Sequence, residues 1–249
     1  MTLRLRQITF SYSPDKKLLD ACSFELEMGS IYALLGSNGA GKTTLFNLVT
    51  GFLRPQEGSI SFKGRCITNL KPYQINRLGI GRTFQDLRTI TKLTVRENIL
   101  LAMRNNPTDR WLMALLPPSF HNNALSQLKT AAEEVASQFF LDEVKHHRAG
   151  EISYGQQKLL TIACCVANGA EIFLLDEPVA GINPDYRNKM VELLKRLKRE
   201  GKTILLIEHN KDFIGEVADS IYLLAAGKLR EYATLKEMKA DPQFSEAYL

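Results

Sequence analysis

Residues 36–44 read GSNGAGKTT, and this stretch decides the fold of the chain. The apolar run IYALL (31–35) precedes it, and KTTLFNLVTGF (42–52) follows with apolar residues at helical spacing. A buried strand, a glycine-rich loop and a helix form the context of a phosphate-binding loop. The stretch fits the pattern G-x-x-x-x-G-K-[ST] at Gly36, Gly41, Lys42 and Thr43.

The residue types in this loop suit a polyphosphate. Glycines let successive backbone N–H groups point toward an anion, and the helix N-terminus adds a partial positive charge. Lys42 can reach the terminal phosphates, and the Thr43 hydroxyl can bind Mg²⁺. The sequence therefore predicts a nucleoside triphosphate site. Its residues are Gly36, Ser37, Asn38, Gly39, Ala40, Gly41, Lys42, Thr43 and Thr44.

Acidic residues follow a second apolar strand, IFLL (172–175). Carboxylates at the carboxyl end of a core strand face the crevice in which such sheets bind ligands. We expect Asp176 to hold Mg²⁺, directly or through water, and Glu177 to orient or deprotonate an attacking water. The strand-like run TILLIEH places His209 at a similar strand end, where we expect a phosphate contact.

Composition excludes several classes of protein. The 249 residues are 45% hydrophobic and 24% charged, as in globular proteins, and no run approaches the about 18 apolar residues of a membrane span. The net charge of +5 is dispersed, which argues against nucleic acid as a partner. The N-terminus alternates polar and apolar residues like a strand, unlike a signal peptide. Four cysteines without metal spacing indicate a reducing, cytosolic compartment.

The order of patterns along the chain predicts an α/β fold. Short strands dominate the N-terminal part, helical patterns dominate from about residue 91 to 168, and strands alternate with helices afterwards. We expect a phosphate-loop NTPase core with a mostly parallel sheet, N-terminal antiparallel strands and an inserted α-helical subdomain. In one domain of 1–249, the core takes 1–90 and 169–249, and the subdomain takes 91–168. Residues 105–123 (NNPTDRWLMALLPPSFHNN) are expected to be irregular.

The run ISYGQQ (152–157) opens a predicted helix with small and amide residues. With the loop and the acidic strand end, it makes the chain resemble the ATP-binding cassette (ABC) ATPases over nearly its whole length. ISYGQQ resembles their signature, usually L-S-G-G-Q, with Tyr154 in place of the first glycine. The resemblance implies that two cassettes pair head to tail, and that each signature closes over ATP in the partner's loop. The signature residues are Ser153, Tyr154, Gly155 and Gln156.

The resemblance also implies roles for other positions. Tyr12 resembles the aromatic residue that stacks on adenine, and Gln85 the glutamine that reaches Mg²⁺ and water and senses the membrane partner. Glu177 and His209 match the general base and the γ-phosphate contact. A dimer-contact loop, in which this family usually ends with Asp, is implied at Ala180, Gly181, Ile182 and Asn183.

One branch of the family is closer than others. LGIGRTFQDLRTITKLTVRENILLAM (78–103), SYGQQ and the final EAYL resemble importer cassettes for branched-chain amino acids and related amides or urea. This implies permease subunits, a second cassette of the same or a sister sequence, and a separate solute-binding protein. It also implies a peripheral place on the cytoplasmic face of the inner membrane. An apolar patch would face the membrane partner or pack within the subdomain; it comprises Trp111, Leu112, Met113, Leu115 and Leu116.

Three alternatives stay open from the sequence. A soluble cassette ATPase of DNA repair or translation usually carries two cassettes or a coiled-coil insertion, and neither is visible. An ATP-gated regulatory module would not need Glu177 and His209. A phosphate-loop kinase would have no use for the signature at 153–156. Solute contacts lie in other subunits of a transporter, so the chain does not name the solute.

Overall fold

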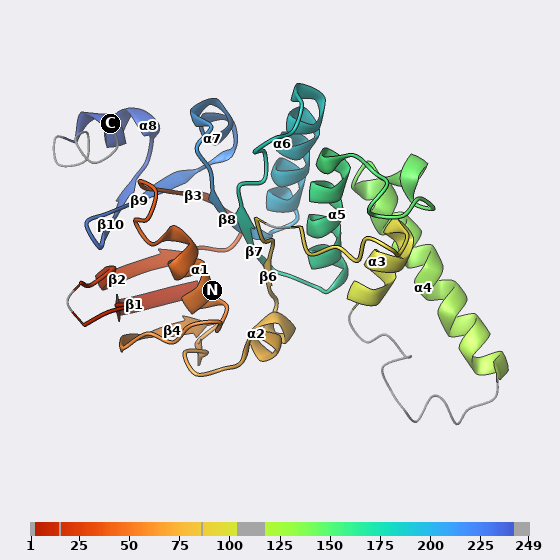
Figure 1. Cartoon of the computed structure of the whole chain (residues 1–249), viewed down its shortest axis with the longest axis horizontal. Coiled ribbons are helices and arrows are strands. Elements are labelled where there is room, and N and C mark those ends of the chain that lie inside the picture. The colour runs from red at the N-terminus through yellow and green to blue at the C-terminus, as the bar shows by residue number, and fades with distance from the viewer. Residues whose placement is uncertain (1–2, 15, 86, 104–117, 242–249) are drawn as a thin grey trace. The chain divides into compact units, whose positions relative to one another are not determined.

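The computed structural model describes residues 3–14, 16–85, 87–103 and 118–241 (Figure 1). The chain forms two compact units. The first unit comprises Met1–Arg82, Glu171–Ala180 and Val191–Leu249, and the second comprises Thr83–Ala170 and Gly181–Met190. Residues 83–90, 169–170 and 181–190 group with the helical unit, whereas the expected α/β core included them. Among the described residues, no helix has the length and apolar character that crossing a bilayer requires.

An antiparallel sheet forms the N-terminal part of the first unit. Its strand order is β2-β1-β4-β5, and β1 pairs antiparallel with both β2 and β4. One face is apolar because buried and exposed side chains alternate along β2. The strands are β1 (Leu3–Phe10), β2 (Leu19–Leu26), β4 (Glu57–Phe62) and β5 (Arg65–Cys66).

A second sheet, with the order β10-β9-β3-β8-β7-β6, carries the carboxyl ends that matter for function. Its strands are parallel except for β10, which pairs antiparallel with β9. The central strands β3, β7 and β8 are buried along their whole length, as expected for a sheet covered on both faces. The strands are β3 (Ile31–Leu35), β6 (Ile80–Arg82), β7 (Ile172–Asp176), β8 (Thr203–Ile207), β9 (Ser220–Ala225) and β10 (Lys228–Tyr232).

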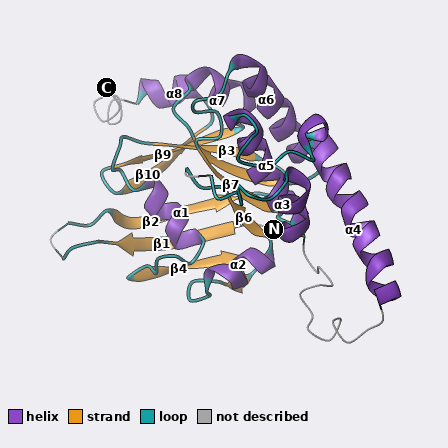
Figure 2. Ribbon diagram, turned by 45° about the vertical axis from the view of Figure 1, so that its right-hand side comes forward, coloured by secondary structure: helices purple, strands orange, loops and turns teal. Residues whose placement is uncertain are grey.

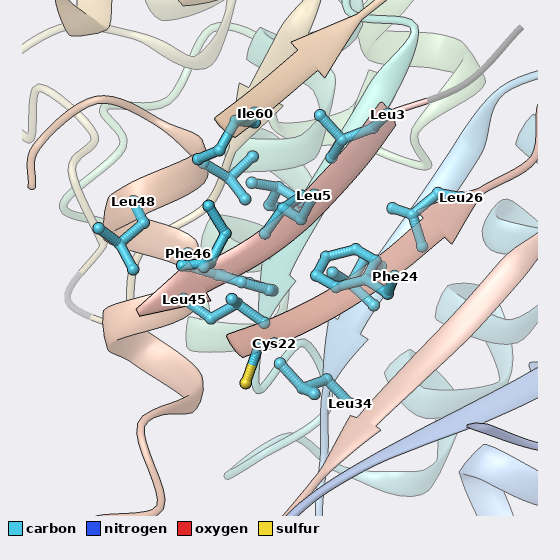
Figure 3. Packing of buried hydrophobic residues seen from close by; sticks show 14 of the residues in the cluster. Leu3, Leu5, Cys22, Phe24, Leu26, Leu34, Leu45, Phe46, Leu48 and Ile60 are labelled. Atoms are coloured by element: carbon cyan, nitrogen blue, oxygen red, sulfur yellow. The ribbon is translucent and has the colours of Figure 1, made fainter. Parts of the chain in front are cut away.

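Helix α1 (Lys42–Val49) lies between the two sheets (Figure 2). Its Leu45 and Phe46 side chains are fully buried in a cluster that takes side chains from both sheets, among them Leu5 and Leu34 (Figure 3). Burial of such residues is the main stabilising contribution and holds α1 rigidly after its loop. The other helices with residues in this unit are α2 (Pro72–Leu78), α6 (Pro184–Arg199), α7 (Lys211–Val217) and α8 (Leu235–Ala240).

The second unit is built from helices that pack on one another. Helix α3 contacts both α4 and α5, and α4 also contacts α5. A capping box at Thr94 and Glu97 begins α3, where each side chain accepts a hydrogen bond from the other's backbone N–H. The elements are α3 (Val95–Ala102), α4 (Pro118–Gln138), the 3₁₀ turn η3 (Asp142–Val144) and α5 (Tyr154–Ala167).

The α/β fold expected from the sequence is confirmed, including the parallel sheet and the antiparallel N-terminal strands. One local expectation is wrong. Residues 118–123 were expected to be irregular, but α4 begins at Pro118. Proline suits the first turn of a helix because the N–H that it lacks has no partner there. The apolar patch at 111–116 lies outside the described residues.

Candidate active site

The loop between β3 and α1 has a shape that its glycines permit. A Cβ on Gly36 would lie 2.5 Å from the carbonyl oxygen of Leu224 on β9. Gly41 caps α1 at φ 107°, where residues with a side chain are strained. Ser37, Asn38 and Gly39 are exposed, and Ala40 is half-buried. The chain therefore turns sharply from a buried strand into a buried helix and presents its backbone between them.

Lys42 is the charged group of this loop. It is 8% exposed, and its Nζ donates to the carbonyl oxygens of Gly36 at 2.7 Å and Ser37 at 3.0 Å. Burial lowers the pKa of Lys42, while the carboxylates of Glu177 and Asp176 raise it. The amine is thus held by the loop backbone in the electrostatic field of the acidic strand end.

Tyr12 lies beside the same loop. Its hydroxyl is 3.2 Å from Oγ1 of Thr44, which is buried, whereas Thr43 is exposed. Phe10 packs edge-on against the Tyr12 ring at a centroid distance of 4.9 Å. The ring is nevertheless 66% exposed, so it offers an aromatic surface next to the loop.

The acidic residues lie at the same sheet edge as the loop. Strands β3, β8 and β7 are parallel neighbours, so their carboxyl ends meet there, and Asp176 is paired in register with Ile207. Asp176 is 8% exposed. It offers a carboxylate and Thr43 a hydroxyl, which are hard oxygen donors of the kind that Mg²⁺ prefers. Among the described residues, no group of three or more His, Cys, Asp or Glu side chains forms a metal cluster.

Arg82, at the end of β6, is a residue that the sequence analysis missed. Its side chain is 5% exposed, and its Nη2 lies 3.8 Å from Oδ2 of Asp176. Its Nη1 donates to Oδ1 of Asn47 on α1 at 2.6 Å, and the guanidinium lies over the Phe46 ring. A buried carboxylate needs such a partner. The only sequence signal was a cation directly after an apolar strand.

Glu177 and His209 face each other across the ends of β7 and β8. Oε1 of Glu177 lies 3.7 Å from Nε2 of His209, which is longer than a hydrogen bond. Both side chains reach solvent, at 27% and 47% exposure. Glu177 has φ 50°, a conformation that is uncommon for a residue with a side chain. A carboxylate and an imidazole thus lie side by side at the carboxyl ends of β7 and β8.

The signature residues begin α5 in the second unit. Ser153 caps this helix: its hydroxyl accepts from Gln156 N at 3.3 Å, and Gln156 Oε1 accepts from Ser153 N at 2.8 Å. Tyr154 is 46% exposed, with the Lys158 ammonium 5.2 Å from its ring centroid. Gly155 is buried, and a Cβ there would lie 2.7 Å from the Tyr186 ring. The signature thus caps and packs a helix.

The remaining predicted residues fall in both units. Ala180 ends a segment of the first unit, while Gly181, Ile182 and Asn183 belong to the second. Oδ1 of Asn183 accepts from Tyr186 N at 3.0 Å and so caps the start of α6. Gln85 is exposed in the second unit, after β6. The part played by Gln85 and by this loop stays a prediction.

The chain is similar to proteins of a known family. Residues 19–180 match the model of a protein family described as ABC transporter. The high-affinity branched-chain amino acid transport ATP-binding protein LivG of Salmonella typhimurium is 36% identical over 228 residues, which cover 91% of this chain and 89% of LivG. BraF of Pseudomonas aeruginosa, with the same description, is 34% identical over 236 residues, covering 93% and 91% of the two chains.

A solved structure is similar over the whole chain. It is the crystal structure of the ADP conformation of an ATP-binding cassette of an ABC transporter. The two proteins share 30% sequence identity with a TM-score of 0.82, and the match covers 100% of this chain and 98% of the other.

Proposed function

The chain belongs to the ABC transporter family, and on this premise we propose that it is the ATP-hydrolysing subunit of a membrane importer for branched-chain amino acids or related small polar solutes. One observation carries the proposal. The phosphate loop at 36–44 lies at the same sheet edge as Asp176, Glu177 and His209. This arrangement brings a triphosphate site and a base together in one unit.

ATP binding is assigned to the loop and to Tyr12. Backbone N–H groups of 36–44 and the amine of Lys42 bind the phosphates, and the exposed Tyr12 ring stacks on adenine. Thr43 and Asp176 would hold Mg²⁺, which would neutralise charge on the phosphate oxygens. Arg82 supports this site because its buried guanidinium lies 3.8 Å from the carboxylate of Asp176 and offers it a compensating charge.

Hydrolysis is assigned to Glu177 and His209. Glu177 accepts the proton of the attacking water, and His209 contacts the γ-phosphate. Both side chains are partly exposed, so both can reach a water molecule or a ligand. Because water is the nucleophile in this assignment, the reaction needs no covalent intermediate on the protein.

A second cassette completes the site. Ser153, Tyr154, Gly155 and Gln156 at the start of α5 contact ATP that is bound to the loop of the partner, since a helix N-terminus attracts phosphate. The loop 180–183 contacts the partner cassette, which is a second copy or a sister chain. ATP bound between the protomers stabilises the closed dimer and not the open one. A ligand shifts an equilibrium between two states only when it binds one of them more tightly.

The proposed assembly lies at the membrane. Permease subunits bind the cassettes at the cytoplasmic face of the inner membrane, and a separate protein captures the solute. The names of LivG and BraF, which are branched-chain amino acid transport proteins, support this place for the chain.

Purification from native membranes tests the proposal. Tagged protein is extracted with detergent, and its companions are identified by mass spectrometry, with an untagged strain as the control. We expect polytopic membrane subunits and a cassette partner. Recovery of soluble partners alone, with the protein absent from membranes, would leave an ATPase and overturn the transport assignment. Uptake of labelled leucine and urea, with wild-type or Glu177→Gln protein restored to a deletion strain, then identifies the solute class.

A further inference from the structure

Glu208 is a buried carboxylate that the proposed chemistry does not use. It follows β8 directly and is 3% exposed, so it requires hydrogen-bond donors. Its Oε1 accepts from the N–H of Val179 at 2.9 Å. Its Oε2 accepts from the N–H groups of His209 at 3.0 Å and Asn210 at 3.3 Å. One side chain thus holds the loop after β7 with one oxygen and the turn after β8 with the other.

These two segments carry the two groups assigned to hydrolysis. Val179 lies two residues after Glu177, and the backbone of His209 is itself bound by Glu208. Strands β7 and β8 are parallel neighbours, so both segments leave the sheet side by side. A fixed distance between them sets how Glu177 and His209 face each other.

The backbone of Glu177 gives a second reason for such a clamp. Its φ of 50° is unfavourable for a residue with a side chain and persists only where neighbouring groups hold it. Glu177 N donates to Ile207 O at 2.9 Å, and Ala180 N donates to Glu177 O at 3.3 Å. The Val179–Glu208 hydrogen bond ties down the same turn from a different strand end.

We propose that Glu208 is a positioning residue for ATP hydrolysis, which fixes the loop of Glu177 against the turn of His209 through its two carboxylate oxygens. The proposal rests on the roles assigned above to Glu177 and His209. Glu208 acts through these neighbours and does not itself contact the nucleotide.

The chemistry of the side chain predicts which substitutions fail. Glutamine has the same length but only one acceptor oxygen, so it can hold residue 179 or residues 209–210, but not both. Aspartate keeps both oxygens but is one methylene shorter. The described hydrogen bonds of Glu208 do not include the phosphate loop at 36–44. The turnover number of a Glu208 variant should therefore fall, while its affinity for ATP should stay unchanged.

The test compares Glu208→Gln, Glu177→Gln and the double variant in the full chain, by ATP hydrolysis and by binding of a non-hydrolysable ATP analogue. We expect Glu208→Gln to lower kcat about 10- to 100-fold through misplacement of the base, with KM and analogue affinity unchanged. In the Glu177→Gln background the further loss of kcat should be smaller than in the wild-type background, because the base is already absent and only the placement of His209 is left to disturb. Thermal unfolding verifies the fold; should Glu208→Gln not fold, Glu208→Asp replaces it.

Glu216→Gln on α7 is the matched control. Glu216 is an exposed carboxylate that lies 3.8 Å from Lys195, and its neutralisation should leave kcat unchanged. Wild-type kcat in Glu208→Gln, or the same loss of rate repeated in the Glu177→Gln background, would overturn the positioning role. Wild-type hydrolysis by Glu177→Gln would instead overturn the general-base assignment in the proposed function.

Discussion

At the scale of single residues, the site combines buried and exposed charge. Asp176 and Lys42 are each 8% exposed, whereas His209 and Glu177 open to solvent. The buried pair suits binding, because electrostatic interactions are stronger away from water. The exposed pair suits proton transfer with a water molecule. This division supports separate roles in binding and in hydrolysis.

Glu177→Gln tests the exposed acid. Glutamine keeps the size of the side chain but cannot accept a proton, so hydrolysis should fall at least about 100-fold while ATP binding stays. Uncleaved ATP should then trap a dimer, seen by size-exclusion chromatography with ATP and Mg²⁺. A variant that hydrolyses ATP quickly would remove Glu177 from this role.

Tyr12 is tested by a pair of substitutions. Tyr12→Ala removes the ring, and its affinity for ATP, measured by calorimetry, should fall about tenfold, as stacking contributes about 1–3 kcal/mol per base. Tyr12→Phe keeps the ring and loses the 3.2 Å contact with Thr44, so its affinity should stay near wild type. Equal losses of ATP affinity in the two variants would show that the hydroxyl, and not the ring, contributes to ATP binding.

At the level of elements, the start of α5 has a structural role of its own. Ser153 and Gln156 form a capping box, and Gly155 packs against Tyr186 near the start of α6. This contact lies within the second unit, which also includes residues 181–190. The signature therefore has a packing role that is independent of ATP.

Gly155→Ala tests this packing. The added Cβ would lie 2.7 Å from Tyr186 Cγ, so overpacking should lower the free energy of unfolding by about 1–3 kcal/mol. Gly215→Ala in α7 is the control: its nearest contact would be 3.8 Å, and alanine there should raise stability by up to about 1 kcal/mol. Denaturant unfolding without nucleotide measures both. Tyr186→Ala should relieve the clash. If Gly155→Ala lowers the free energy of unfolding equally in the Tyr186→Ala background, the close contact between residues 155 and 186 is contradicted.

At the scale of the whole molecule, the described chain carries a phosphate loop in one unit and a signature in the other. Two copies paired head to tail would then form two composite sites. In the proposed mechanism, a chain that has lost either its phosphate loop or its signature is inactive when it pairs only with itself.

Mixing two defective chains tests this pairing. Lys42→Ala should abolish ATP binding but keep the signature, and Ser153→Arg should keep the loop but block the signature. A mixture should regain hydrolysis, because random pairing restores up to about a quarter of the composite sites. Each chain alone is the control. A mixture no more active than its parts would exclude pairing of two copies and favour a sister cassette.

Much of the fold followed from patterns local in the sequence. Fully apolar strands predicted the parallel sheet, and the glycine-rich loop predicted the turn into α1. The elements α2 and β10 were not predicted, because each buries only one residue and so shows no apolar pattern in the sequence. Helix α4 was expected to begin later, since its first residues, PSFHNN, resemble a loop in composition.

Local patterns predicted the phosphate loop and the acidic strand end, because each consists of neighbouring residues whose spacing carries the chemistry, and the resemblance to ABC ATPases added the signature. Three contacts became visible in the tertiary structure: Arg82 lies near Asp176, Tyr12 lies beside Thr44, and Glu208 connects the loops after β7 and β8. These partners are far apart in the chain, and no periodicity links them. These residues meet because the strand order and the packing of α1 bring the strand ends together. Strand order and helix packing are properties of the whole fold.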